Sequence, residues 1–143
     1  MEYDLVAKFH FLVDWGGEKV GFAECSGLDV ETEIIEYRHG ASKGYQKMKI
    51  PGMQKYANVV LKRGIMPADN EFFDWWNTVS LNKVERRDVT ISLLSESHDP
   101  VMVWKIVKAW PTKITGTDLK ADGNEIAIET LELTHEGIIV QND

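Results

Sequence analysis

The sequence predicts a mainly β, single-domain protein with one α-helix. Apolar and polar residues alternate along several segments, which is the pattern of strands that bury one face. Only residues 69–81 place apolar side chains at the spacing of a helix face. The chain has 143 residues, the length of one ordinary domain, and its 43% hydrophobic and 27% charged residues are typical of a globular protein.

The bulk composition argues against several classes of protein. The net charge is −7 and the sequence pI is about 5.1, and no run of Lys or Arg suggests a nucleic-acid surface. Cys25 is the only cysteine, so no intrachain disulfide forms, which fits a reducing compartment. No stretch reaches the length of an apolar membrane span, and the first residues lack the basic and apolar regions of a secretory signal. We therefore expect neither a membrane span nor a Sec-type signal.

The first strand is expected at residues 5–13, where apolar side chains alternate with polar ones. Residues 14–18 break this pattern with a pair of glycines, which is typical of a hairpin turn. Residues 19–24 would then return as the second strand. The apolar face of the first strand would hold Leu5, Ala7, Phe9, Phe11 and Val13.

Residues 28–38 form the third expected strand, in which neither face is cleanly apolar. Packing in the protein's own core explains such a strand poorly, so we expect it to lie at an edge or to protrude. Residues 39–54 are rich in Gly, Pro and Lys and are predicted to form a long loop, and loops of that length are usually functional or disordered. The next strand is expected at residues 56–63, so that residues 28–63 would form a long hairpin with an extended tip.

One helix is expected, at residues 69–81. Asp69 is the candidate N-cap, and the acidic residues that follow suit the positive end of the helix dipole. Two adjacent tryptophans cannot both point squarely inward, so either Trp75 or Phe73 would reach a second contact. The core-facing side chains of this helix would be Phe72, Trp76 and Val79.

Three further strands complete the expected fold. Residues 88–97 alternate, and residues 101–115 form a long strand in which Pro111 suggests a bend or an edge position. Residues 125–140 form the last strand, and a change in the phase of its apolar residues near Thr130 suggests a β-bulge. The side chains expected on the inner faces are Val89, Ile91 and Leu93, followed by Met102, Trp104, Ile106 and Trp110.

The residues that could carry catalysis or bind a metal form no recognisable motif. Cys25 is expected to be a buried structural thiol, since a nucleophile needs an adjacent base. The stretch Gly40–Gly44 has the wrong spacing for a phosphate loop. We therefore expect no catalytic residue, no metal and no cofactor. The histidines lack the spacing of a metal site and stand at His10, His39, His98 and His135.

Six segments carry a resemblance to a known family. They are FHFLVDW at 9–15, GFAECSGLDVETEIIEYRHG at 21–40, KIPGMQKYANVVLKRGI at 49–65, FFDWWNTV at 72–79, RRDVTISLL at 86–94 and IAIETLELTHEGI at 126–138. In this order they resemble the gp19-like tail-tube proteins of contractile phages and of phage-derived contractile injection systems. Each motif is weak alone, and their order and completeness over nearly the whole chain make the resemblance specific.

The resemblance implies two packed antiparallel sheets that form a small barrel-like sandwich with one helix, a fold shared with hemolysin-coregulated protein of type VI secretion. Six copies would close into a ring around a β-lined channel, and rings would stack into a tube that a contracting sheath propels. The implied partners are further copies of the chain, the sheath protein, baseplate or tube-initiator proteins, a tube cap or terminator, and cargo or spike proteins. The particle would be assembled in the bacterial cytoplasm, and the subunit would not be an enzyme.

The resemblance also implies roles for surface residues. The hairpin would continue the lumen wall and reach the neighbouring ring, where its basic tip would meet an acidic surface. The helix would lie on the outside, and its acids would contact the sheath. The expected inter-ring residues are Glu31, Glu33, Glu36, Tyr37, Arg38, His39, Lys43, Lys47 and Lys49, with the three glutamates as the acidic candidates, and the expected sheath-facing residues are Asp69, Glu71 and Asp74.

Three alternatives stay open at this point. A tube-initiator paralogue, which forms only the ring next to the baseplate, would share the same motifs. A monomeric β-sandwich that binds a small ligand or a glycan would have a concave pocket and would not assemble. A small hydrolase has no catalytic constellation behind it.

Overall fold

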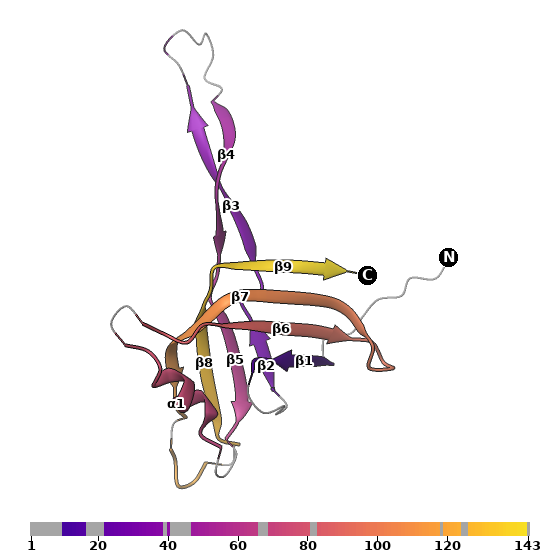
Figure 1. The fold of residues 1–143 in the computed structure, drawn as a ribbon, viewed down its shortest axis with the longest axis vertical. Helices are drawn as coiled ribbons and strands as arrows, with labels where there is room; N and C mark the ends of the chain where they lie inside the picture. The colour runs from indigo at the N-terminus through magenta and orange to yellow at the C-terminus, as the bar shows by residue number, and fades with distance from the viewer. Residues whose placement is uncertain are drawn as a thin grey trace.

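The computed structural model describes residues 10–16, 22–38, 40, 47–65, 69–80, 83–117, 119–123 and 126–142. Within them the chain forms nine strands and one short helix, as Figure 1 shows. The predicted fold class is confirmed, since the molecule is mainly β and its strands pair antiparallel. Residues 5–9 and 19–21 of the first two expected strands lie outside the described residues, as do His39 and Lys43.

The first sheet contains four strands in the order β1-β6-β7-β9. Their bounds are β1 Phe11–Asp14, β6 Arg87–Leu94, β7 Pro100–Thr115 and β9 Gly137–Asn142. One face of this sheet is buried, with Val13 on β1 opposite Ile91 on β6 and with Ile106 on β7. The inward side chains predicted for residues 88–97 are therefore confirmed at Val89 and Ile91.

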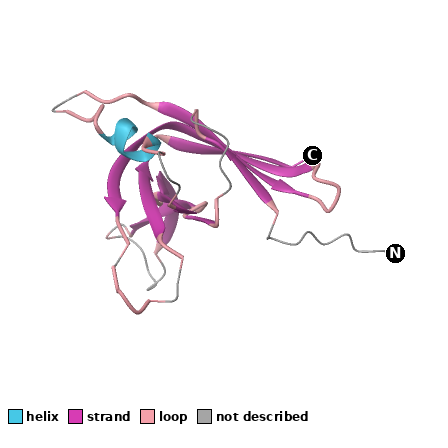
Figure 2. Ribbon diagram, turned by 90° about the horizontal axis from the view of Figure 1, so that it is seen from below, coloured by secondary structure: helices cyan, strands magenta, loops and turns pink. Residues whose placement is uncertain are grey.

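The second sheet has the order β7-β8-β5-β2, so β7 belongs to both sheets. The bounds of the other strands are β8 Ile128–Thr134, β5 Val59–Gly64 and β2 Glu24–Ser26. The long strand bends from one sheet into the other (Figure 1), and Figure 2 shows the two sheets meeting at a corner beside the helix. Lys108 lies at this bend with a φ of 51°, a value that is uncommon for a residue with a side chain.

The strand expected at residues 125–140 is two strands. β9 and the end of β8 at Leu133 and Thr134 pair with β7 in one antiparallel register, and the two strands are interrupted at residues 135–136, beside the bend of β7. The β-bulge predicted near Thr130 is wrong, because β8 pairs with β5 without a shift. The register shift instead lies on β7, between Pro111 and Lys113.

The core lies between the two sheets and is closed by an aromatic cluster. Trp15, which follows β1, is 1% exposed and meets the Phe72 ring edge-on at a centroid distance of 5.1 Å. Such edge-to-face pairs stabilise a core beyond their buried area. The remaining buried apolar residues are Val13, Val59, Leu61, Trp75, Val89, Ile91, Ile106, Ala109, Leu131 and Leu133.

The helix α1, Glu71–Trp76, is shorter than the predicted range 69–81. Its N-cap position is Asn70, which makes no side-chain cap hydrogen bond, so the prediction of Asp69 as N-cap is wrong. Phe72 and Trp75 are its buried residues, where Phe72, Trp76 and Val79 were predicted; Trp76 and Val79 are partly buried. Trp75 lies inward because its ring packs on Trp15 and its indole N–H donates to the Glu85 carbonyl at 2.8 Å. Phe73 is instead half exposed.

Arg63 on β5 is fully buried and links the helix to the second sheet. Its guanidinium forms two hydrogen bonds of 3.2 Å with the Asp69 carboxylate and one of 2.6 Å with Glu129 on β8. The same group lies 3.8 Å from the Phe72 ring centroid and 5.6 Å from that of Trp15. A buried charge is tolerated only with such partners, so Arg63 fixes the segment before the helix against the sheet.

Replacing Arg63→Ala should lower the free energy of unfolding by about 3–5 kcal/mol, because it leaves the Asp69 and Glu129 carboxylates without their partner in a nearly closed site. Chemical denaturation followed by tryptophan fluorescence measures the loss. The matched control is Lys62→Ala, since Lys62 pairs with Glu24 in solvent and should contribute less than about 1 kcal/mol. Equal losses for the two variants would contradict this account of the core.

Candidate assembly surface

A two-stranded ribbon runs from the core out into solvent. β2 pairs with β5, and the pairing continues in the same register into the first part of β3, Val30–Tyr37, and β4, Met48–Tyr56, before it shifts between Thr32 and Ile34. Gly27 lies at the junction with a φ of +87°, and a Cβ there would overlap the Asn58 carbonyl oxygen, so only glycine fits. The long loop predicted at residues 39–54 is therefore wrong in its second part, which is strand.

The outer half of this ribbon, the β3–β4 hairpin, projects away from both sheets (Figure 1). One face of its outer part holds two opposed apolar pairs, Ile35 with Ile50 and Tyr37 with Met48. These four side chains are 41–61% exposed. An isolated two-stranded hairpin is marginally stable in water, so an apolar face of this kind favours contact with a partner. We call this set the hairpin's apolar face.

The other face of the hairpin is more polar at the same level. It carries Glu36 opposite Lys49, and Ile34 opposite Pro51. Ile34 is 66% exposed, and thus offers an apolar side chain that points away from the hairpin's apolar face.

The charged residues that the sequence analysis assigned to an inter-ring contact lie along the hairpin, and two of the glutamates are already paired within it. Lys47 lies 3.3 Å from Glu36, and Lys55 lies 2.6 Å from Glu33. The hydrogen bond from Lys55 to Glu33 raises the pKa of that amine. Apart from the partly buried Glu33, the described members of the set are exposed, namely Glu31, Glu36, Tyr37, Arg38, Lys47 and Lys49.

The hairpin and the rest of the chain carry opposite charge. Residues 30–56 contain five Lys or Arg and three Glu, a net charge of +2. The remaining residues contain 11 Lys or Arg and 20 Asp or Glu, a net charge of −9. Opposite charges of this kind favour encounter between the hairpin of one copy and the body of another.

Within the part of the chain that the structure describes, the first sheet ends in two strands that each pair on one side. β1 pairs with β6, and β9 pairs with β7. Because every neighbouring pair in this sheet is antiparallel, β1 and β9 run in opposite directions. Unpaired strand edges are templates for pairing with another chain. Val140 and Ile139 on β9 are 44% and 49% exposed, and Leu12 on β1 is 47% exposed.

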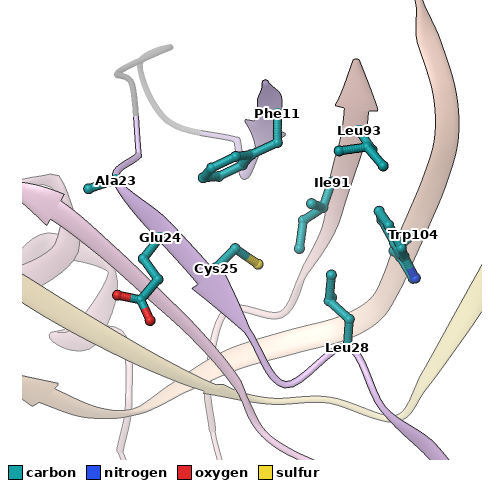
Figure 3. A pocket seen from close by; sticks show the side chains of 8 residues that line it. All are labelled: Phe11, Ala23, Glu24, Cys25, Leu28, Ile91, Leu93 and Trp104. Carbon is teal, nitrogen blue, oxygen red and sulfur yellow. The ribbon is translucent and has the colours of Figure 1, made fainter. Parts of the chain in front are cut away.

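A cavity of about 570 Å³ lies at the corner between β1 and β2, the end strands of the two sheets (Figure 3). Its lining is mostly apolar, with a single carboxylate and a single thiol. Burial raises the pKa of the Cys25 thiol to about 12, and the Glu24 charge adds to this shift. A cavity with few polar groups suits apolar side chains or an apolar ligand. The lining residues are Phe11, Ala23, Glu24, Cys25, Leu28, Ile91, Leu93 and Trp104.

The three acids expected to face a sheath differ in exposure. The Asp69 side chain is 9% exposed and is held by Arg63, so its expected place on the free surface is wrong. Its oxygen also accepts the Glu71 backbone N–H at 3.1 Å, which orders the start of the helix. Asp74 is exposed, and Glu71 is partly buried.

The described residues contain neither a metal site nor a membrane-spanning helix. They contain no group of three or more His, Cys, Asp or Glu side chains that could hold a metal ion. Nor does any helix among them have the length and apolar character needed to cross a membrane. The surfaces that remain are the hairpin, the two strand edges and the corner cavity. The apolar face, the edges and the cavity were not predicted from the sequence. The available signal for the hairpin was the alternation of isoleucine and methionine with charged residues at residues 34–37 and 47–50.

Comparison with known proteins finds relatives that cover nearly the whole chain. Residues 7–139 match the family described as T4-like virus tail tube protein gp19. A chain of the cryo-EM structure of an extracellular contractile injection system, the PVC sheath-tube complex in the extended state, is 35% identical with a TM-score of 0.88. That match covers 97% of this chain and 93% of the other. No curated protein sequence matches.

Two further solved structures contain similar chains. A chain of the anti-feeding prophage tube-terminating cap is 32% identical with a TM-score of 0.91, over 100% of this chain and 95% of that one. A chain of the anti-feeding prophage baseplate is 25% identical with a TM-score of 0.84, over 99% and 98% of the two chains. Hcp1 from Flavobacterium johnsoniae shares the fold at 13% identity, with a TM-score of 0.58 over 93% and 95% of the two chains. The resemblance drawn from the sequence is confirmed.

The partly buried Cys25 thiol should react slowly with a maleimide. With a pKa of about 12 instead of 9.0, its thiolate fraction at pH 8 is about a thousandfold lower, and the thiolate is the reacting form. Because the folded pKa is raised, the neutral thiol favours the folded state below pH 9, and this contribution is lost as the pH rises from 9 towards 12. Labelling followed by mass spectrometry in native buffer and in denaturant measures the ratio.

The control for this measurement is Ala23→Cys in a Cys25→Ser background, since Ala23 lies exposed at the edge of the same cavity. Its labelling should differ little between native buffer and denaturant. Native labelling of Cys25 as fast as that of this control would contradict the burial of the thiol.

Proposed function

The chain belongs to the T4-like virus tail tube protein gp19 family and is a structural subunit of the tube of a phage tail or contractile injection system, and we propose that six copies of it close into rings that stack into a hollow conduit. The number six comes from the family resemblance. The observation that carries the proposal is the pair of open, oppositely running edges on β1 and β9.

Ring closure follows from these edges. When β9 of one copy lies beside β1 of the next, the two strands are antiparallel and extend the first sheet from copy to copy. A head-to-tail contact that closes in this way gives a ring and leaves no free edge in the first sheet, which lowers the risk of uncontrolled aggregation. The same contact repeated six times would make one continuous sheet around a channel.

The channel wall would be the outer face of the first sheet, because its inner face packs on the core. Two rows of cross-strand neighbours would line it. One row holds Leu12, Ser92, Val103 and Gln141, and the other holds Asp14, Thr90, Lys105 and Ile139. With one acidic and one basic residue per copy, these rows would give a wall of low net charge.

The partners of the subunit follow from the complexes that contain similar chains. These complexes are a sheath-tube assembly, a tube-terminating cap and a baseplate. We infer that this chain also meets a sheath protein, a terminator and a baseplate or initiator protein, and that sheath contraction drives the tube to deliver cargo. Assembly in the bacterial cytoplasm and a role without catalysis belong to the same proposal.

Between the two tube roles, we propose the main tube for this chain, with the ring that initiates the tube as the alternative. The chain is 35% identical to a chain of the PVC sheath-tube complex and 25% identical to a chain of the anti-feeding prophage baseplate. A main-tube subunit polymerises beyond one ring, whereas an initiator stops there.

Electron microscopy of the purified chain, with mass photometry in parallel, tests the proposed function. We expect rings of six that stack into hollow tubes as the concentration rises. Single rings at every concentration would favour the initiator. A monomer at every concentration, also in the presence of its sheath and baseplate proteins, would contradict the proposal and favour a monomeric ligand-binding sandwich that uses the corner cavity.

The basic residues near the hairpin tip are proposed to bridge stacked rings. The double change Lys47→Glu and Lys49→Glu should leave rings intact and abolish tubes, because it puts like charges where the tip meets an acidic body. Negative-stain images count rings and tubes. The charge-matched control is Lys83→Glu with Lys120→Glu, both exposed and outside the hairpin. Normal tubes from the hairpin variant would refute the bridging role.

The acids Glu71 and Asp74 on the helix remain the proposed sheath contacts. Their neutralisation, Glu71→Gln with Asp74→Asn, should weaken co-sedimentation of sheath protein with tubes, and added salt should weaken it in the unsubstituted chain too. Each exposed pair contributes only about 0–1 kcal/mol, but the contacts repeat around every ring. Unchanged sheath binding would eliminate these acids as contacts. The pair Asp122→Asn with Glu96→Gln serves as a control for charge.

A further inference from the structure

The hairpin leaves the body beside the edge strand β9. At its root, the Tyr56 ring lies 5.7 Å from the His135 ring, and His135 Nε2 lies 2.9 Å from the Ala57 carbonyl oxygen. His135 stands at the interruption between β8 and β9, so these contacts fix the root where β9 begins. From there the hairpin rises past β9, across the strand direction of the first sheet (Figure 1).

The hairpin points in the direction in which the next copy would be added to the ring. If β9 of one copy pairs with β1 of the next, the next copy lies on the side of β9 towards which the hairpin points. The hairpin strands have eight and nine residues, so the hairpin extends about 27 Å at about 3.3 Å per residue. A four-stranded sheet is roughly 19 Å wide. The hairpin is therefore long enough to cross the whole first sheet of the neighbouring copy.

The edge of the next copy that would lie nearest to β9 is its β1 edge, which borders the corner cavity. This cavity lies behind β1, between β1 and β2. The hairpin is the extension of the β2–β5 ribbon, so it leaves from the layer of the second sheet.

The chemistry of the two surfaces is complementary. The hairpin's apolar face presents Ile35, Tyr37, Met48 and Ile50 to solvent, and the cavity presents Phe11, Leu28 and Leu93. Burial of these side chains against one another would remove both exposed apolar surfaces from water. The hairpin's net charge of +2 also opposes the net charge of −9 on the body that would receive it.

We propose that the hairpin's apolar face docks over the corner cavity of the next copy in the same ring, so that each subunit completes the open corner of its neighbour. This inference rests on the proposed ring. In this arrangement the paired strands of the hairpin make a contact within the ring, and only the basic tip of the hairpin remains for the contact between rings. It also gives the cavity an occupant, a second copy of this chain.

A cross-linking experiment on assembled tubes tests the proposal. The cavity thiol is placed by Ala23→Cys in a Cys25→Ser background, because the native thiol is a poor nucleophile. The hairpin thiol is placed by Ile50→Cys or, in a second variant, by Met48→Cys. A short bifunctional maleimide then joins copies, and denaturing gels separate the products. The matched control is Ile34→Cys, which points away from the hairpin's apolar face.

Contacts within a ring and contacts between rings give different ladders. Head-to-tail links around a ring close on themselves, so the ladder should stop at the number of subunits in the ring. Links along the tube would continue without limit, and such an open-ended ladder would overturn the proposal. So would the absence of cross-links from both hairpin sites in tubes that form normally, or equal cross-linking from Ile34→Cys. Failure of the unsubstituted chain to form rings would instead refute the proposed function on which the inference rests.

Discussion

The ribbon that begins in the body as β2–β5 and leaves it as β3–β4 determines how this protein can assemble. Its register is constant from Glu24 opposite Lys62 to Thr32 opposite Gln54, and it shifts only further out, between Thr32 and Ile34. Its inner half is locked in the body, where Leu61 is buried and Arg63 is bound to carboxylates from two sides. Because pairing passes from β2–β5 into β3–β4 without a shift, the outer half has no freedom to fold back and must leave the body at the glycine junction. A hairpin held in solvent in this way exposes apolar side chains that only another molecule can bury.

The relative strengths of the available contacts decide which surface holds an assembly together. Full burial of an aliphatic or aromatic side chain contributes about 1.5–3 kcal/mol, whereas an exposed ion pair contributes about 0–1 kcal/mol. The pairs of Glu36 with Lys47 and of Glu33 with Lys55 also lie within one hairpin, so they order it without joining it to anything else. Apolar contacts and backbone pairing at β1 and β9 should therefore provide most of the stability of a ring, and charge should direct its approach and stacking.

The sequence predicted the parts of the fold that local periodicity determines. Val89 and Ile91 alternate with polar residues and are buried as expected, and the two-sided polarity of residues 28–38 identified a strand without a core of its own. Features that depend on distant partners could not be read in this way. Trp75 faces inward because Trp15 and Glu85 lie there, and Asp69 is held by Arg63 across the start of the helix. The apparent change of phase near Thr130 arose because Ile126 and Ile128 are exposed apolar residues, which a sequence pattern counts as core.

The assembly surfaces were harder to predict than the fold, since an edge strand and a corner cavity exist only once the strand order is known. In the proposed ring, the first sheet continues from one copy to the next through β9 and β1. Cryo-EM reconstruction of tubes formed by the purified chain tests it most directly. We expect an antiparallel ladder of backbone hydrogen bonds between residues 137–142 of one copy and residues 11–14 of its neighbour. A ring in which both of these edges stay unpaired, with other surfaces forming the interface, would contradict it.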